Sequence, residues 1–480
     1  MDKSRVSVLW FRQDLRIADN PALIEACKDG SIVPIYILDD KSAGDWKYGA
    51  ASRWFLFEAL TDLNKLLNNQ LLFFEGDASK VLIDIVKEVG AEGVYWNRCY
   101  EPWAIERDSR IKKSLKALNI SVQSFNSSLL WEPWAVLKKD GTPYKVFTPF
   151  YRKGCLVSSA PRMPLEIPSN INCVAFEGSK SLSELGLRPK NNWYKKFENI
   201  WDVSSDGVAA KLRGFLDEGL DVYREGRNFP SKKYVSALSP YLRFGMISPN
   251  MVWYAAISEK TSKSEDRNLD TFLSELGWRE FSYYLLYHFP QLPSQNLQSK
   301  FDAFPWHKDT DDMLEIWEKG LTGYPLVDAG MRELYQTGYM HNRLRMVVGS
   351  FLVKNLLIDW REGEKWFWDC LVDADLASNS AGWQWIAGCG ADAAPYFRIF
   401  NPITQSEKFD SEGEYIRKYV PELSKLPSKY IHAPWQAPEE ILKHNNVELG
   451  VTYPLPIVDI KESRQAALEA FSRTKLQVQA

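Results

Sequence analysis

The hydrophobic pattern changes its period once along the chain, and this change limits the fold more than any other feature of the sequence. Within residues 1–131, short β-branched or aromatic runs alternate with amphipathic helical stretches. The runs cover 6–11, 31–38, 71–76 and 93–97, and the helical stretches include 51–69 and 106–119. Strands that alternate with helices predict an α/β domain with a Rossmann-like parallel sheet.

After residue 205, apolar residues recur three and four positions apart, which is typical of amphipathic helices. The predicted helices are 207–218, 249–258, 269–288, 311–318, 326–337 and 340–357. Residues 132–205 are rich in Pro, Lys, Ser and Asn and lack a sustained period. We therefore predict an α/β domain at 1–131, a long connector at 132–205 and a larger all-α domain at 206–480. A chain of 480 residues has room for two cores.

Composition excludes several classes of protein. With 45% hydrophobic and 25% charged residues, no apolar run long enough to span a bilayer and no cleavable leader, we expect a cytoplasmic protein without a membrane partner. The six cysteines form no CxxC pair and the five histidines show no ligand spacing, so we expect reduced thiols and no metal. The sequence contains no GxxxxGK[ST], HExxH or GxSxG motif, which argues against common kinases and hydrolases.

Charge and aromatic content leave the ligand open. The formal net charge of −3 means that any DNA site has to be a local basic patch. The 19 tryptophans exceed what packing alone needs, and they suit stacking, light absorption or electron transfer as well as a core.

Polar residues gather inside apolar helical sequence at 272–280, 340–349, 366–376 and 379–385. Asn342, Arg345 and Met346 are spaced to share one helix face. The acidic pair Asp373 and Asp375 is suited to neutralise Arg345 and to accept hydrogen bonds from a ligand, because a buried arginine without a carboxylate is costly. An architectural salt bridge explains the same spacings equally well.

These segments resemble the photolyase/cryptochrome family. The likeness rests on WFRQDLR at 10–16, GWREF at 277–281, TGYP at 322–325 followed by Asp328-Ala329, MHNR at 340–343, LLIDW at 356–360 and RIFNP at 398–402. Residues 50–54 (AASRW) and 452–459 (TYPLPIVD) favour the class III group of bacterial cyclobutane dimer photolyases, which are related to plant cryptochromes. The resemblance implies the photolyase/cryptochrome fold, with the helical half binding FAD.

The resemblance also implies which residues hold a U-shaped FAD. Arg345 with Asp373 is expected to flank the flavin ring, Asp375 to accept from its polar edge and Asn379 to face its N5 atom. The remaining expected cofactor contacts are Tyr223, Ser236, Leu238, Ser239, Arg279 and Asn342. Val235 departs from the family, where Thr is common, so one phosphate-binding hydroxyl is lost and FAD retention is expected to be weaker.

Three tryptophans match the family's electron-transfer chain from the flavin to the surface: Trp383, Trp360 and Trp306. For any one of them, core packing is the alternative, and spacing does not show that the three are adjacent. Trp383 and Trp385 are two positions apart, so one ring is expected to face the flavin and the other the lesion cavity.

The implied substrate is a cyclobutane pyrimidine dimer in UV-damaged DNA, flipped out of the duplex. Photolyases for the (6-4) photoproduct carry histidines where this chain has Asn342 and Met346. The expected lesion pocket consists of Glu275, Trp278, Asn342, Met346 and Trp385, with Glu275 in a catalytic role. Arg343, Arg398 and Lys408 are candidates for phosphate contacts, although most surface cations are only solvated. Met346 is also compatible with ordinary core filling.

A second chromophore is expected in the N-terminal domain. Residues 97–108 lack the Asn-Glu pair with which enterobacterial photolyases hold methenyltetrahydrofolate, so a folate in another arrangement and a deazaflavin both stay open. The main alternative function is a cryptochrome photoreceptor with FAD and a protein signalling partner. The short tail after Pro456 favours a repair enzyme, which we expect to be monomeric. An FAD oxidoreductase would need a pyridine-nucleotide site that the sequence lacks.

Overall fold

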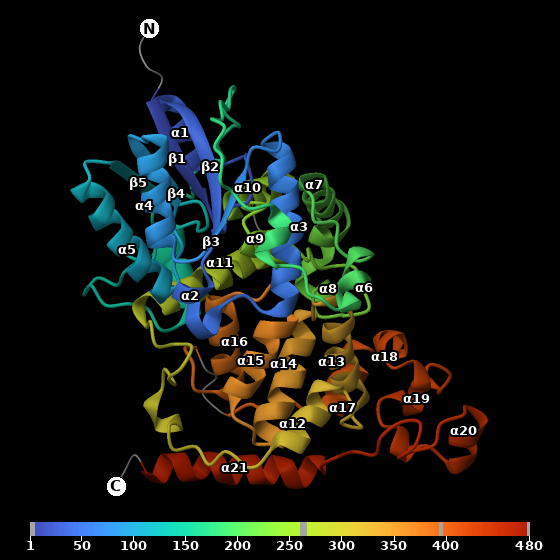
Figure 1. The fold of residues 1–480 in the computed structure, drawn as a ribbon. Helices are drawn as coiled ribbons and strands as arrows, with labels where there is room; N and C mark the ends of the chain where they lie inside the picture. Colours follow the sequence, from blue (N-terminus) through green and yellow to red (C-terminus); the bar gives the residue numbers. More distant parts are fainter. Residues whose placement is uncertain (1–4, 260–265, 393–396, 478–480) are drawn as a thin grey trace. The chain divides into compact units, whose positions relative to one another are not determined.

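The β-branched and aromatic runs of the first half form one parallel five-stranded sheet. The structure is a computed structural model that describes residues 5–259, 266–392 and 397–477. The strands are β1 (Arg5–Phe11), β2 (Gly30–Leu38), β3 (Leu72–Glu75), β4 (Gly93–Asn97) and β5 (Ser121–Phe125), in the spatial order β3-β2-β1-β4-β5 (Figure 1). Every pairing is parallel. Strand β5 was not predicted, because its sequence SVQSF lies at the sheet edge and carries little apolar signal.

Helices connect the strands, as the alternating pattern predicts. They are α1 (Pro21–Asp29), α2 (Asp40–Ala43), η1 (Gly44–Trp46), α3 (Ala50–Leu66), α4 (Ala78–Val89) and α5 (Pro102–Ala117). Helix α1 begins where the Asn20 side chain accepts a hydrogen bond from the Leu23 amide at 3.1 Å, with Pro21 in the first turn. Both features favour a helix start, because the cap satisfies an amide that has no partner within the helix.

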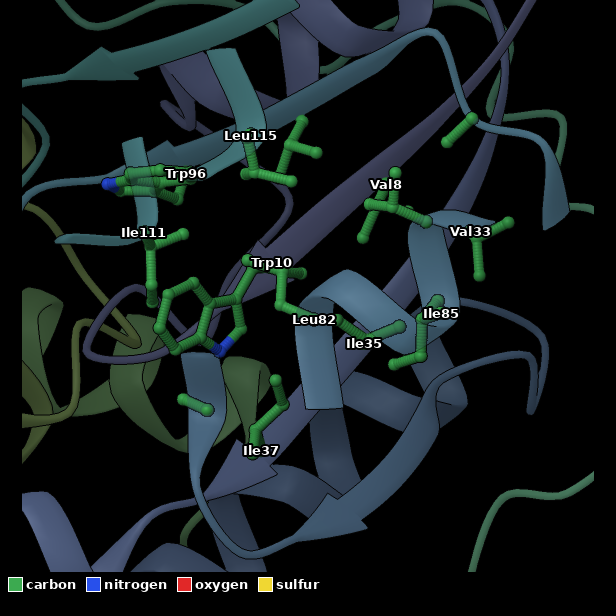
Figure 2. Packing of buried hydrophobic residues seen from close by; sticks show 14 residues of the cluster. Val8, Trp10, Val33, Ile35, Ile37, Leu82, Ile85, Trp96, Ile111 and Leu115 are labelled. Atoms are coloured by element: carbon green, nitrogen blue, oxygen red, sulfur yellow. The ribbon is translucent and has the colours of Figure 1, made fainter. Parts of the chain in front are cut away.

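One hydrophobic core lies between the sheet and helices α4 and α5. Figure 2 shows Leu82 and Ile85 of α4 and Ile111 and Leu115 of α5 facing the strands. Their partners on the sheet are Val8, Trp10, Val33, Ile35, Ile37 and Trp96. The rings of Trp10 and Trp96 meet edge to face at 5.9 Å, an arrangement that aromatic pairs prefer.

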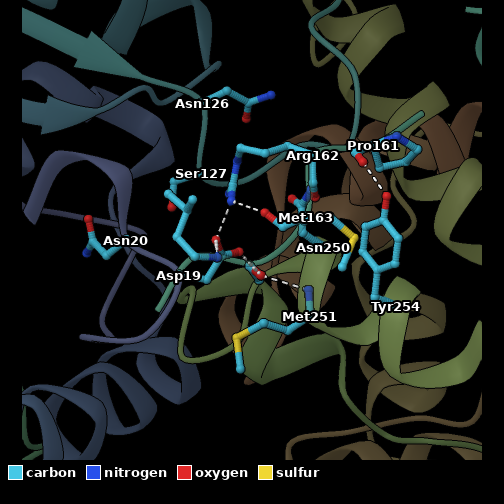
Figure 3. Close-up of polar contacts among 12 residues, drawn as sticks. Asp19, Asn20, Asn126, Ser127, Pro161, Arg162, Met163, Asn250, Met251 and Tyr254 are labelled. Atoms are coloured by element: carbon cyan, nitrogen blue, oxygen red, sulfur yellow. Dashed lines mark hydrogen bonds and ion pairs between the residues drawn. The ribbon is translucent and has the colours of Figure 1, made fainter. Parts of the chain in front are cut away.

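The predicted connector consists of short turns fixed by polar contacts. It contains η2 (Pro149–Gly154), η3 (Cys155–Val157), η4 (Leu182–Leu185), η5 (Asn192–Tyr194) and α6 (Lys195–Glu198). The buried Asp19 carboxylate pairs with Arg162 and accepts the Leu165 amide, while Asn250 donates to the Arg162 carbonyl (Figure 3). Buried backbone groups of an irregular segment need such partners, so the lack of periodicity in the sequence does not mean a lack of order.

The rest of the chain is helical, and none of its described residues belongs to a strand. The longer helices are α7 (Ser205–Gly214), α10 (Pro249–Glu259), α11 (Arg267–His288), α12 (Asp311–Glu318), α13 (Pro325–Thr337), α14 (Asn342–Ser350), α15 (Trp360–Cys370), α16 (Leu376–Ala387), α17 (Pro402–Phe409) and α21 (Ile460–Gln477). The shorter ones are η6 (Phe215–Gly219), η7 (Leu220–Val222), α8 (Tyr223–Gly226), α9 (Ser239–Arg243), η8 (Ser299–Phe301), η9 (Phe351–Asn355), α18 (Glu414–Tyr419), η10 (Pro421–Leu423), α19 (Ser428–Ile431), η11 (Pro434–Gln436) and α20 (Glu439–His444). The predicted fold class, a parallel α/β region followed by a helical region, is confirmed.

The folded chain forms two compact units. Unit 1 contains 1–221, 236–290 and 372–377, and unit 2 contains 222–235, 291–371 and 378–480. The segment bounds predicted from the sequence, 131 and 205, stay a prediction. None of the helices that the structure describes is long and apolar enough to cross a membrane.

Candidate active site

The two acidic residues singled out from the sequence lie on the short segment 372–377 of unit 1, and both are buried. Asp373 and Asp375 are 7% and 8% exposed. The Ser239 hydroxyl at the start of α9 donates to Asp373 at 2.6 Å, and the Tyr283 hydroxyl of α11 donates to Asp375 at 2.5 Å. The structure therefore brings together two of the predicted cofactor residues, Ser239 and Asp373, and presents two ionisable acceptors on one segment.

The backbone just before α9 is strained. Ala237 has a φ of 48°, a left-handed conformation that residues other than Gly rarely adopt and that costs on the order of 1 kcal/mol or more. It lies between two predicted phosphate-side residues, Ser236 and Leu238, and Leu238 is buried as the cap of α9. Strained backbone of this kind is common at ligand-binding sites, where the surrounding structure holds the unfavourable conformation in place.

Helix α11 carries the other predicted residues of unit 1. Glu275, Trp278 and Arg279 are spaced to share a helix face and are each half-buried. The Trp278 ring stacks on Phe147 with centroids 3.8 Å apart. Arg279 donates to the Ser128 carbonyl at 2.7 Å and lies 4.8 Å from the centre of the Tyr283 ring, the same tyrosine that holds Asp375.

Helix α14 presents the predicted polar face in unit 2. Asn342 is its first residue, and Arg343, Arg345 and Met346 follow within its first two turns. His341 precedes the helix, and its Nδ1 accepts the Arg343 amide at 3.2 Å. Burial, together with Arg343, Arg345 and Arg227, lowers the pKa of His341 to about 3, so this ring is neutral at physiological pH.

Two cations, Arg343 and Lys408, lie over the ring of Phe409 in α17. Arg343 lies 4.2 Å and Lys408 5.3 Å from the centre of that ring, and Arg343 also donates to Asn228. Burial lowers the pKa of Arg343, and the positive charges of Arg227 and Arg398 lower it further. Three predicted phosphate contacts, Arg343, Arg398 and Lys408, thus belong to one positive cluster in unit 2. A chain with a net charge of −3 needs such a local patch for DNA.

Asn379 of α16 is held by a residue that the sequence did not single out. Its amide donates to the Glu364 carbonyl of α15 at 3.0 Å, and the Ser380 hydroxyl donates to the Glu364 carboxyl at 2.5 Å. Burial raises the pKa of Glu364 to about 8, against the lowering effect of the Ser380 hydrogen bond. The Glu364 carboxyl, which holds its proton more tightly than usual, thus lies beside Asn379, the predicted neighbour of the flavin N5 atom. The packing of the two helices shows this relationship, and the sequence does not.

The three predicted electron-transfer tryptophans all lie in unit 2 and differ in burial. Trp383 and Trp360 are fully buried, while Trp306 is half-buried against Phe304, with ring centroids 4.3 Å apart. The Trp360 indole donates to Asn296 at 3.0 Å. A fourth ring, that of Trp317, lies 6.3 Å from Trp383 and was not predicted. The direct sequence of electron steps among the three stays a prediction.

Three more of the predicted residues differ in burial. Tyr223 is buried in α8, Trp385 is half-buried in α16, and Arg398 is exposed. Arg345 donates to the Met340 carbonyl at 2.8 Å. The predicted pairing of Arg345 with Asp373 joins unit 2 to unit 1 and stays a prediction.

Unit 1 also contains an aromatic pocket of about 150 Å³ that the sequence did not predict. Its lining includes Trp96, Arg98, Tyr100, Lys112, Trp134 and Tyr287. The Trp134 ring lies 5.5 Å from Tyr287 and 5.7 Å from the Arg98 guanidinium, and Lys112 lies 5.6 Å from the Trp96 ring. Aromatic walls with cations over them suit a flat, conjugated ligand that carries negative charge.

Comparison with known proteins places the whole chain in one family. The sequence profile of the FAD binding domain of DNA photolyase matches residues 272–473, and that of DNA photolyase matches residues 7–168. A deoxyribodipyrimidine photo-lyase from Agrobacterium fabrum is 47% identical over 98% of this chain and 99% of its own length. Cryptochrome-2 of Arabidopsis thaliana is 39% identical over 99% of this chain and 80% of its own length.

A solved structure agrees with these sequence matches. The crystal structure of a bacterial class III photolyase from Agrobacterium tumefaciens is similar to this chain with a TM-score of 0.94 and 47% identity, over 99% of this chain and 98% of that one. A parallel α/β region followed by a helical region that matches an FAD-binding profile defines the class of this protein as a flavoprotein. The chain belongs to the DNA photolyase/cryptochrome family, and the likeness to class III photolyases inferred from the sequence is confirmed.

Proposed function

We propose that this protein is a deoxyribodipyrimidine photo-lyase, which uses blue light and reduced FAD to split cyclobutane pyrimidine dimers in DNA. The observation that carries the proposal is the 47% identity, over nearly the full length of both chains, with a deoxyribodipyrimidine photo-lyase. Asn342 and Met346 on α14 support the same lesion, because neither side chain can exchange the proton that repair of a (6-4) photoproduct requires.

FAD fits the residues present. The buried carboxylates Asp373 and Asp375 suit the polar edge of an isoalloxazine ring, and the strained turn at Ala237 before Ser239 suits a phosphate. Reduced FAD supplies the electron that opens the cyclobutane ring and receives it back. The chain positions that group through Asp375, Arg345 and Asn379, with Tyr223, Ser236, Leu238, Arg279 and Asn342 as the remaining proposed contacts.

Splitting a cyclobutane ring needs an electron out and back, so the lesion residues have only to bind and orient. In the proposed pocket, Glu275 and Asn342 form hydrogen bonds with the thymine edges, while Trp278 and Trp385 cover the apolar ring and Met346 packs against it. Flipping the dimer out costs a few kcal/mol of stacking and pairing, less for a distorted lesion. The cations Arg343, Arg398 and Lys408 bind the flanking phosphates.

Trp383, Trp360 and Trp306 have a separate task in this proposal. They return oxidised flavin to its working state by carrying an electron inward from the half-buried Trp306. None of them takes part in the electron transfer to the lesion.

The aromatic pocket of unit 1 is the proposed site of a second, light-harvesting chromophore. A folate such as methenyltetrahydrofolate would place its ring between aromatic walls and its negative tail near Arg98 and Lys112. A deazaflavin is the alternative occupant. Extraction of the purified protein and absorbance spectroscopy distinguish them, and Trp134→Ala should remove the bound chromophore while FAD is retained.

The decisive assay offers the purified, reduced protein two oligonucleotides under blue light. One carries a single cyclobutane thymine dimer and the other a single (6-4) photoproduct. We expect the first to be restored and the second to stay unchanged. Repair of the (6-4) lesion would refute the substrate assignment, and repair of neither by an FAD-loaded, reduced protein would favour a cryptochrome, the class of the 39% identical plant relative.

A further inference from the structure

Segment 372–377, which carries Asp373 and Asp375, is fixed in unit 1 by one buried guanidinium. Arg243, the last residue of α9, is 4% exposed. Its Nε–H donates to the Ala374 carbonyl at 2.8 Å, and the same nitrogen lies 3.9 Å from the Asp375 carboxylate. Arg243 thus holds the backbone between the two carboxylates and faces one of them directly.

The other side of Arg243 faces the carboxyl edge of the sheet. The Nη2 atom of Arg243 lies 3.7 Å from the carboxylate of Glu101. Glu101 is 3% exposed and accepts a hydrogen bond from Gln13 at 2.5 Å. Gln13 follows β1 and Glu101 follows β4, which are neighbouring parallel strands, so their ends meet at one edge. One line of contacts therefore runs from the sheet to Asp375.

The backbone after Arg243 is clamped to the same edge. Gly245 has a φ of 66°, and a Cβ there would lie 2.0 Å from the Gln13 carbonyl oxygen, so only glycine allows this approach. The Leu15 amide donates to the Phe244 carbonyl at 3.1 Å. The guanidinium of Arg243 consequently has little freedom to move away from the two carboxylates.

The charges around Arg243 match this geometry. Burial alone would lower the pKa of Arg243, but Tyr48, Glu101 and Asp375 raise it above its ordinary value, so the guanidinium stays charged. One buried cation thus faces two buried carboxylates. Loss of the cation would remove a favourable charge interaction from both carboxylates.

We propose that Arg243 is a positioning residue for the flavin: it sets the place of the Asp375 carboxylate and so tunes the reduction potential and retention of FAD. This inference rests on the proposed function, in which Asp375 accepts a hydrogen bond from the polar edge of the flavin. Arg243 itself need not touch the cofactor, since it acts through Asp375 and Ala374.

The test compares Arg243→Gln and Arg243→Lys with the wild type. In Arg243→Gln we expect a more negative midpoint potential of bound FAD at pH 8 and a dissociation constant for FAD raised by roughly tenfold. The affinity is expected to fall because the Asp375 carboxylate and the Ala374 carbonyl lose the guanidinium that fixes their place. Arg243→Lys keeps the charge and should restore most of the potential.

Asp375→Asn separates positioning from a general structural effect. In the Asp375→Asn background, Arg243→Gln should change the potential and the affinity for FAD little further, because the two residues act in series. Additive changes would overturn the inference. Should neither Arg243 variant fold, Glu101→Gln serves instead: it removes one carboxylate at constant shape and should move the potential in the positive direction. No shift in Glu101→Gln would also overturn it.

Failure of the inference and failure of the proposed function give different results. A wild-type protein that retains no FAD after expression with ample flavin refutes the flavin site and the role of Arg243 together. A wild type that retains FAD, beside a folded Arg243→Gln variant with unchanged potential and affinity, refutes the role of Arg243 alone.

Discussion

Gly363 of α15 lies directly against the indole ring of Trp383 on α16. A Cβ at position 363 would be 2.2 Å from the Cη2 atom of that ring and 2.6 Å from two more of its carbons. Trp360 begins the same helix three residues earlier. The glycine therefore determines how closely Trp383 packs on the helix that carries Trp360.

This contact predicts the effect of Gly363→Ala. The added methyl group has to displace the indole, so we expect the variant to lose about 1–3 kcal/mol of stability and to photoreduce its flavin more slowly. Thermal unfolding and photoreduction kinetics measure the two effects. Gly214→Ala, in α7 with open space around its Cβ position, is the control and should be at least as stable as the wild type. A Gly363→Ala variant with wild-type photoreduction would separate Gly363 from electron transfer.

The substitutions Trp360→Phe and Trp306→Phe test the proposed electron-transfer chain directly. A phenylalanine is much harder to oxidise than a tryptophan, so photoreduction of oxidised flavin should slow strongly while repair by chemically pre-reduced protein stays nearly intact. Trp201→Phe, a buried tryptophan of unit 1 outside the predicted chain, should affect neither. Equal loss of both activities in Trp360→Phe would mean that Trp360 is structural.

Local pattern predicts helices, but it does not show which residues meet across the fold. Residues 311–318 were predicted and observed as α12, because a long amphipathic period is a local signal. Predicted helix 340–357 is observed as α14, which ends at Ser350, followed directly by the π-helix η9 up to Asn355; apolar spacing does not reveal this change in hydrogen bonding. Arg243 was not predicted, since its partner Ala374 is 131 residues away.

The same limit explains the missed neighbour of Asn379. The spacing of Asn342, Arg345 and Met346 placed them correctly on one helix, because residues three and four apart are neighbours in any helix. Glu364, by contrast, is one of several charged residues in the sequence of α15, and nothing in its spacing distinguishes it from the others. Its importance comes from burial against Ser380 and Asn379, which depends on how two helices pack.

Glu364→Gln tests the buried acid. The pKa of Glu364 is raised to about 8 in the folded protein, chiefly by burial. The folded state therefore holds a proton that the unfolded chain releases near its ordinary pKa. Stability falls as the pH rises between those two values, by up to about 1.4 kcal/mol per pH unit. Glutamine cannot ionise, so the variant should lose this slope and gain stability at pH 8 relative to the wild type.

Chemical unfolding at a series of pH values measures this difference. Glu362→Gln, a half-exposed position on the same helix paired with Lys365, is the matched control and should keep the wild-type slope. An unchanged slope in Glu364→Gln would show that Glu364 is ionised in the folded protein at neutral pH.

Arg343→Gln tests the positive cluster around Phe409 as a phosphate site. Arg343 lies 4.2 Å from the Phe409 ring, with Lys408 over the same ring and Arg398 near enough to lower its pKa. A DNA phosphate bound here would reduce the repulsion among these cations. The cations in turn would displace counterions from the DNA. We expect Arg343→Gln to weaken binding to damaged and undamaged DNA alike and to reduce the slope of log K against log salt by about one.

The control is Lys365→Gln on α15, an exposed lysine already paired with Glu362, which should leave affinity and salt slope unchanged. Asn342→Ala, one residue before Arg343, provides the contrasting result. In the proposed pocket its amide bonds the lesion, so it should weaken binding to dimer-containing DNA only and keep the full salt slope. If Arg343→Gln behaved like Asn342→Ala, Arg343 would read the lesion, and the phosphate contact would have to come from Arg398 and Lys408 instead.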